Sequence, residues 1–215
     1  MIDITFDLET CALCPTAAVM SIGAVAWDRN QADTPFYEAG NMQNADYLYL
    51  RHIDLRSQFV NGFTFDQDTA NWWASRSKEA KMAVTAPDCQ PCDSVENVVV
   101  DFFKRIKEIA NGDEICLWSQ GSDFDIAILR HICQTFHIAL PVSYKNFRDH
   151  RTFFLEGARI ILDAAQQPYD ANRAYSLVEP YEGDGVAHDP IYDCKRSIYS
   201  TWQMMKHLKC LNIEK

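Results

Sequence analysis

Ile2-Asp-Ile-Thr-Phe-Asp7-Leu-Glu9-Thr10 is the stretch from which the fold can be worked out. Apolar and polar residues alternate over residues 2–7, as they do in a half-buried β-strand, and Asp7 and Glu9 lie at its end. Residues two apart on a strand point to the same face, so both carboxylates can reach one or two shared cations. The pair alone is a weak signal, because a solvated acidic strand end explains it as well.

Two further acidic sites lie far along the chain. In Gly121-Ser-Asp123-Phe-Asp125-Ile-Ala-Ile-Leu129 the pattern predicts a helix from residue 124 to about 136, with Ser122 or Asp123 as its N-cap and Asp125 in its first turn. In Gly185-Val-Ala-His188-Asp189-Pro-Ile-Tyr-Asp193 we expect Asp193 in the first turn of a last helix, at about residues 190–208. His188 then lies in the preceding loop, and Asp189 caps the helix or stays solvated.

Together the three sites contain four carboxylates, on Asp7, Glu9, Asp125 and Asp193. Each site is joined to a hydrophobic element, and such elements can bring distant residues to one place. Four clustered carboxylates repel each other and are costly to desolvate unless a cation is present. We therefore predict a divalent-metal site and phosphoryl-transfer chemistry. A nearby histidine can take a proton from an attacking water, although His188 alone would also fit a surface loop.

The remaining pattern predicts one mixed sheet. Strands are expected at residues 19–27, 36–40, 114–119 and 146–148, with a short strand or helix within 47–55. Helices are expected around residues 69–73, 77–82 and 152–165, and a clearly amphipathic one over 95–110 that ends at Asn111-Gly112. Residues 86–93 and 166–187 are expected to be loops. This order predicts an α/β fold in a single domain, residues 1–215 with a core of about 2–208, in which helices flank a mixed sheet.

Composition limits the class of protein. The 215 residues carry a formal net charge of −10, which argues against broad non-specific binding to a duplex. There is neither an apolar run long enough for a membrane span nor a signal-peptide pattern, so we expect no membrane contact and a cytoplasmic location. The pairs Cys11/Cys14 and Cys89/Cys92 have zinc-ligand spacing and leave a zinc-organised regulator as an alternative. Buried thiols in a reducing compartment are the simpler explanation.

Taken in order, the acidic motifs resemble the DEDDh class of 3′–5′ exonucleases, which has a ribonuclease H-like fold. The matching pieces are Phe6-Asp7-Leu-Glu9-Thr10, then Phe124-Asp125 before Ile-Ala-Ile-Leu, then His188 ahead of Asp193. Thr69-x-x-Trp72-Trp73 and Arg148-Asp149-x-Arg151-Thr152 make the chain most similar to the phage exonuclease A family and related RNase T-like proteins, from residue 2 to about 208. The tyrosine-type variant of the class fits less well, because Asp189 stands where its tyrosine would be.

The resemblance implies a two-metal site with Mg²⁺ or Mn²⁺. Oxygen ligands suit these hard cations on independent grounds. The implied metal ligands are Asp7, Glu9, Asp125 and Asp193, and His188 is the implied base. The implied substrate contacts are Leu8, Thr10, Phe124, Trp73 and Arg151. Tryptophans can stack on any base, although we expect at least one of Trp72 and Trp73 to be core, and Arg151 can pair with nearby acids instead.

The implied activity is release of nucleoside 5′-monophosphates from the 3′ end of single-stranded nucleic acid. We expect DNA because of the phage resemblance, with an RNase T-like exoribonuclease as the alternative. A non-catalytic binding module is a further alternative, which the presence of all four carboxylates disfavours. If a phage encodes the protein, the location is the host cytoplasm. A homodimer remains among the options for the oligomeric state.

Overall fold

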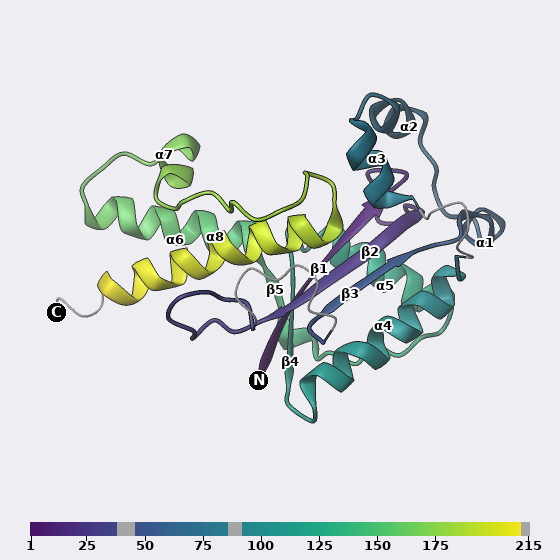
Figure 1. The fold of residues 1–215 in the computed structure, drawn as a ribbon, viewed down its shortest axis with the longest axis horizontal. Coiled ribbons are helices and arrows are strands. Elements are labelled where there is room, and N and C mark those ends of the chain that lie inside the picture. Colours follow the sequence, from purple (N-terminus) through teal and green to yellow (C-terminus); the bar gives the residue numbers. More distant parts are fainter. Residues whose placement is uncertain (38–45, 86–91, 212–215) are drawn as a thin grey trace.

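A five-stranded mixed sheet forms the centre of the computed structural model, which describes residues 1–37, 46–85 and 92–211 (Figure 1). Its strands are β1 (Ile2–Thr10), β2 (Val19–Trp27), β3 (Leu48–His52), β4 (Ile115–Ser119) and β5 (Phe147–Asp149). The order across the sheet is β3-β2-β1-β4-β5. Neighbours among β1, β2 and β3 pair antiparallel, whereas β4 is parallel to β1 and β5 to β4. The predicted α/β fold with a mixed sheet is confirmed.

Helices cover both faces of this sheet. They are α1 (Leu55–Val60), α2 (Gln67–Ala74), α3 (Lys78–Val84), α4 (Val95–Ala110), α5 (Asp125–Thr135), α6 (His150–Ala164), α7 (Ala171–Ser176) and α8 (Pro190–Leu211), with a 3₁₀ turn, η1 (Tyr144–Asn146). One core packs α4 and α5 on the sheet, and a second packs α8 on the opposite face, with α6 beside α8 (Figure 1). Within the described residues, no helix is long and apolar enough to cross a membrane.

The central strand β1 contributes apolar side chains to the core on one face of the sheet and acidic side chains on the other face. Ile4, Phe6 and Leu8 point into the core under α4 and α5, where each is almost fully buried. The alternation of a strand therefore turns Asp7 and Glu9 to the other face, on which α8 packs. The apolar half of the motif anchors the strand, and the acidic half is presented at the start of α8.

The amphipathic helix α4 has the expected bounds, Val95–Ala110. The side chain of Ser94 accepts a hydrogen bond from the backbone N–H of Asn97 and so caps its start. Asn111 ends it in the left-handed conformation, with φ of 48°. Local signals at both ends agree with the apolar stripe, which is why the sequence predicted this helix in full.

Three local expectations need correction. The third strand of the sheet is β3, not 36–40: Phe36 makes only an isolated bridge to Trp27, and residues 38–40 lie outside the described residues. Pairing with β2 and burial of Tyr49 against α4 decide this choice, and the Tyr49 hydroxyl donates to the Val98 carbonyl at 3.0 Å. The expected loop 166–187 contains α7, a six-residue helix capped by Asp170. Neither Ser122 nor Asp123 caps α5, because its N-cap position is Phe124 without a side-chain bond.

Candidate active site

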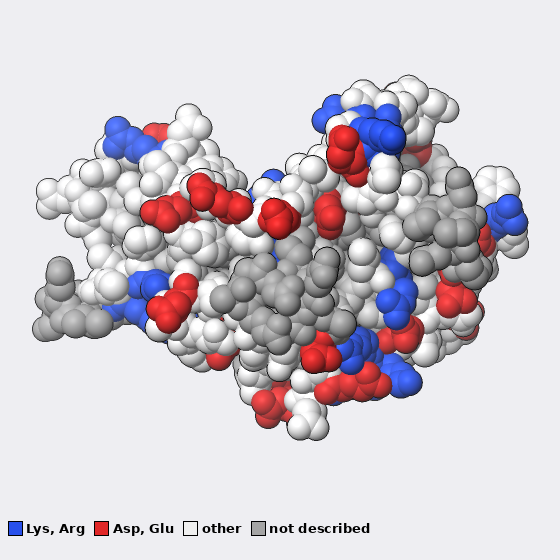
Figure 2. Space-filling model, viewed as in Figure 1, with Lys and Arg blue, Asp and Glu red and all other residues white. Residues whose placement is uncertain are grey.

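The ends of three elements bring the acidic motifs together. Ligand atoms of Glu9 at the end of β1, His188 before α8 and Asp193 in α8 all lie within 4.8 Å of one another. Asp125, at the start of α5, accepts a hydrogen bond at Oδ1 from the Leu8 backbone N–H at 3.3 Å. Figure 2 shows a hollow in the surface between α7 on one side and α2 and α3 on the other, with acidic side chains at its floor.

Each of the four carboxyl groups has a raised pKa, and burial is the first cause in every case. The pKa of Asp7 lies well above its usual value because of burial and then the charges of Asp125, Glu9 and Asp193. Burial and the charges of Asp193 and Asp125 raise the pKa of Glu9 to about 9. Burial raises the pKa of Asp125 to about 7 against the Leu8 hydrogen bond, and that of Asp193 against the charge of Arg196. The four groups therefore form one electrostatic unit.

Two oxygens of this unit accept no hydrogen bond, and one of them lies beside an arginine. Asp7 Oδ2 and Asp193 Oδ1 are buried and accept no hydrogen bond, although Arg196 Nη2 lies 3.1 Å from the second. A buried carboxylate oxygen without a donor is costly unless a charge compensates it. The ligand atoms of the four acidic residues are all carboxylate oxygens, which suits hard divalent cations such as Mg²⁺ or Mn²⁺. The residues present therefore fit the predicted metal site.

Glycine on β2 lets α8 come close enough to bring Asp193 into the group. Gly23 pairs with Asp7 across the sheet, and a Cβ at Gly23 would lie 2.6 Å from Pro190 Cβ and 2.9 Å from its carbonyl carbon. No larger residue fits there without moving the start of α8. Asp189 caps this start, as expected, by accepting from the N–H groups of Ile191 and Tyr192 at 2.9 and 3.2 Å. The position of Asp193 is therefore fixed by the contact of α8 with β2 and by the cap at the start of α8.

His188 is held by its backbone and by its ring. Its N–H donates to Asp193 Oδ2 at 2.9 Å, and its φ of 72° places it in the left-handed region, which is uncommon for a residue other than glycine. The ring centroid lies 4.8 Å from that of Trp72 and 5.8 Å from that of Trp73. Trp73 Nε1 in turn donates to the Thr10 carbonyl at 2.9 Å. Helix α2 thus ties the histidine to the end of β1.

A cavity of about 540 Å³ opens beside Glu9 and His188. Four of the five expected substrate contacts line it, together with Trp72 and Leu13: they are Leu8, Thr10, Phe124 and Trp73. The fifth, Arg151, lines a different cavity, next to α6 and α8. We call the first of these the Trp72/Trp73 cavity.

Sequence reasoning missed two residues of this region. Gly23 gave no signal, because only the approach of α8 makes a glycine necessary there. Arg196 could have been found from its spacing, since residues three apart on a helix are neighbours and it follows Asp193 by three. The zinc alternative stays a prediction: Cys11, Cys14 and Cys92 form no disulfide, and Cys89 lies outside the described residues.

Comparison with known proteins agrees with this geometry. The model of the 3′–5′ exoribonuclease Rv2179c-like domain family matches residues 2–201. An exodeoxyribonuclease of Enterobacteria phage T4 is 27% identical over 232 residues, covering 96% of this chain and 88% of the phage protein.

Two solved structures are similar in fold. Cell-death related nuclease 4 (CRN-4) has a TM-score of 0.58 at 14% identity over 95% of this chain, and the chain spans only 64% of its length. The nuclease domain of 3′hExo, a DEDDh family member bound to rAMP, has a TM-score of 0.52 at 13% identity, covering 95% of this chain and 92% of that one. The chain therefore belongs to the family of Rv2179c-like 3′–5′ exoribonuclease domains and is a 3′–5′ exonuclease of the DEDDh kind.

Proposed function

We propose that this exonuclease shortens single-stranded DNA from its 3′ end with two divalent cations held by Asp7, Glu9, Asp125 and Asp193. One observation carries the proposal: carboxyl groups from three distant segments are buried beside a histidine, close enough that the charges of Asp125 and Asp193 raise the pKa of Asp7 and Glu9. Keeping so many acids buried together costs stability, and a cation site is the use that offsets this cost. Mg²⁺ and Mn²⁺ both suit the oxygen ligands.

The reaction is hydrolysis of the last phosphodiester. A water oxygen adds to phosphorus, a ring nitrogen of His188 takes a proton from that water, and the bond from phosphorus to the 3′ oxygen of the penultimate nucleotide breaks. The leaving oxygen takes a proton from solvent, and His188 later returns its own proton. Bound divalent cations supply charge stabilisation for the phosphate and leaving oxygens. The products are a nucleoside 5′-monophosphate and a strand one nucleotide shorter.

The chain's own residues would orient the participants. The backbone hydrogen bond to Asp193 and the two tryptophan rings restrict the imidazole of His188 to the edge of the carboxylate group. The Trp72/Trp73 cavity is large enough for one nucleoside, and its apolar walls suit a base and sugar. Leu8, Glu9 and Phe124 all line this cavity, so a terminal nucleotide there would hold its 5′ phosphate toward the carboxylates.

The similarity to the phage exodeoxyribonuclease, over nearly the whole of both chains, supports DNA as the substrate. RNA is the second candidate, because the family model describes exoribonuclease domains. A protein distinguishes the two through the 2′-hydroxyl. Two hydroxyls in the cavity lining already donate hydrogen bonds within the protein. Thr10 Oγ1 donates to the Ala12 carbonyl, and Thr69 Oγ1 donates to Asp66.

The test is digestion of 5′-labelled DNA and RNA oligomers of one sequence, with Mg²⁺, with Mn²⁺ and with a chelator. We expect a ladder of products that shorten from the 3′ end, only with cation, and faster on DNA. Degradation of RNA alone would replace DNA by RNA as the substrate. Shortening from the 5′ end, or full activity in the chelator, would refute the proposed mechanism.

A further inference from the structure

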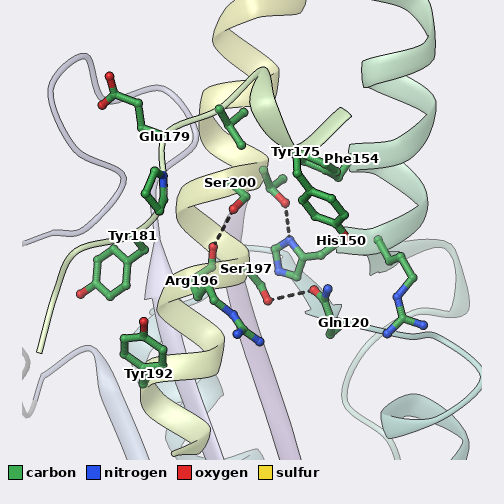
Figure 3. Close-up of a pocket in the computed structure, with 14 residues that line it drawn as sticks. Gln120, His150, Phe154, Tyr175, Glu179, Tyr181, Tyr192, Arg196, Ser197 and Ser200 are labelled. Carbon is green, nitrogen blue, oxygen red and sulfur yellow. Dashed lines mark hydrogen bonds between the residues drawn. The ribbon is translucent and has the colours of Figure 1, made fainter. Parts of the chain in front are cut away.

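A second cavity lies on the other side of the carboxylates from the Trp72/Trp73 cavity. It measures about 500 Å³ and is formed by α6, α7, α8 and the segment before α8 (Figure 3). Its basic residues are Arg151 on α6 and Arg196 on α8, and Tyr175, Tyr181 and Tyr192 add aromatic surface. We call it the Arg151/Arg196 cavity.

Two guanidinium groups connect this cavity to the carboxylates. Arg196 Nη2 lies 3.1 Å from Asp193 Oδ1, and its charge lowers the pKa of both Asp193 and Asp7. The charge of Arg151 lowers the pKa of Asp125. The Trp72/Trp73 cavity meets the same carboxylates from its own side through Glu9 and His188. The acidic group therefore stands between two cavities, one mainly apolar and the other with two arginines.

The Arg151/Arg196 cavity has the chemistry of a nucleotide site. A guanidinium has five N–H donors, so Arg196 can keep Asp193 and still bind a phosphate oxygen. Ser197 and Gln120 are hydrogen-bonded to each other at 2.8 Å on the cavity wall. The acidic residue of the lining, Glu179, turns its carboxylate away from Arg196 in Figure 3. In a chain with net charge −10, a cavity lined by two arginines and a single acidic residue favours an anionic ligand.

A 3′ exonuclease must hold nucleotides on both sides of the bond that it breaks. The terminal nucleotide lies on one side, and the penultimate nucleotide of the retained strand lies on the other. We propose that the Arg151/Arg196 cavity binds the penultimate nucleotide, with Arg151 and Arg196 on its 5′ phosphate and the tyrosines beside its base. This inference rests on the proposed function and extends it to a site for the retained strand.

Two substrates separate this role from catalysis. A short oligonucleotide fills both cavities, whereas the p-nitrophenyl ester of thymidine 5′-monophosphate has a nitrophenol in place of the retained strand. Arg151→Gln should lower kcat/KM for the oligonucleotide about tenfold or more, with a loss on the ester that is several-fold smaller. Removing one phosphate contact should also reduce the slope of log(kcat/KM) against log(salt) by about 0.7 for a single strand. Arg151→Lys keeps the charge without the planar guanidinium, so its kcat/KM for the oligonucleotide should lie between those of wild type and Arg151→Gln.

Arg159→Gln is the matched control, because Arg159 lies on the same helix with its guanidinium over Tyr169, outside the cavity lining. It removes the same charge and should leave the ratio of the two activities at the wild-type value. Equal losses on both substrates in Arg151→Gln, or no loss on either, would overturn the inference. Failure of the proposed function shows differently, in the wild-type protein itself, which would then cleave neither substrate, shorten the oligonucleotide from its 5′ end, or keep its activity in a chelator.

Discussion

Both the backbone and the ring of His188 are held at the edge of the carboxylate group, where a general base is expected. Its left-handed backbone is held by the hydrogen bond to Asp193, and its ring lies against Trp72. If it accepts the proton of the attacking water, His188→Ala should lower kcat about 10²–10⁴-fold. Cation binding, measured by calorimetry, should persist because the four carboxylates remain. His207→Ala, an exposed histidine of α8, is the control, and an unchanged rate and pH profile in His188→Ala would remove the assigned role.

Asp7 is expected to matter in opposite ways for catalysis and for stability. Burial and three neighbouring acids raise its pKa, so its ionised form opposes folding in the absence of a cation. Asp7→Asn should therefore lose hydrolysis and, in a chelator at pH 8, unfold at a higher temperature than wild type. Asp163→Asn, an exposed aspartate of α6, should change neither property. A less stable Asp7→Asn under these conditions would contradict the account of the carboxylate group.

At the level of elements, the contact between β2 and α8 fixes the distance between the acidic segments. Gly23→Ala puts a methyl group 2.6 Å from Pro190 Cβ, against backbone that can only move as part of α8. We expect a loss of about 1–3 kcal/mol in the free energy of unfolding. We also expect kcat to fall in protein that is still folded, because Asp193 moves with the helix.

Gly157→Ala supplies the matched control for that prediction. Its new methyl group would meet the side chain of Met204, at 2.8 Å from Cγ, between α6 and α8. A methionine side chain can adopt another rotamer, and Met204 lies outside the carboxylate group. This variant should lose stability and keep its kcat. If both variants lose activity in proportion to stability alone, the close approach at Gly23 has no special bearing on the site.

Elements were predictable from the sequence where local signals agreed with tertiary packing. The helix α4 has a capping serine, an apolar stripe and a left-handed Asn111, and each signal is local. The third strand depended on which segment could pair with β2 and bury Tyr49, and the six-residue α7 has little apolar pattern of its own. The acidic motifs were visible as residues, whereas Gly23 and the cavity at Arg151 exist only once α8 and α6 are packed.

His150 links three elements inside the fold, so it bears on the stability of the protein as a unit. Its ring nitrogens hydrogen-bond to Thr5 of β1 and Thr201 of α8, at 2.8 and 2.7 Å, and burial lowers its pKa to about 3. The unfolded chain binds a proton near pH 6.5, so this contribution to stability is full above that pH and is lost as pH falls toward 3. The expected loss at pH 5 is about 2 kcal/mol.

Chemical denaturation between pH 7 and pH 5 measures this effect. His150→Gln should be less stable at pH 7, because it disturbs a buried hydrogen-bond pair, yet its stability should fall less between the two pH values. The difference between the two proteins isolates His150 from every other titrating group. Parallel pH dependences would show that the histidine is not kept neutral by the fold.

If the carboxylate group holds cations as proposed, the stability of the fold depends on pH and on cations together. Burial raises the pKa of Glu9 to about 9 and that of Asp125 to about 7 in the folded protein, against about 4 in an unfolded chain. Between these values the folded state holds more protons, so without a cation its stability falls as pH rises. A divalent cation bound there would replace those protons and would stabilise the folded state by about 2.7 kcal/mol at a hundredfold excess over Kd.

The rise in unfolding temperature on adding Mg²⁺ or Mn²⁺ should therefore be larger at pH 8 than at pH 6. Thermal unfolding in chelator and in cation, at both pH values, measures it without any nucleic acid. Asp7→Asn should show a smaller rise and a weaker pH dependence, because one repelling charge and one ligand are gone. An equal rise at both pH values would mean that cations bind elsewhere on this acidic chain, since only a site that competes with protons couples the two.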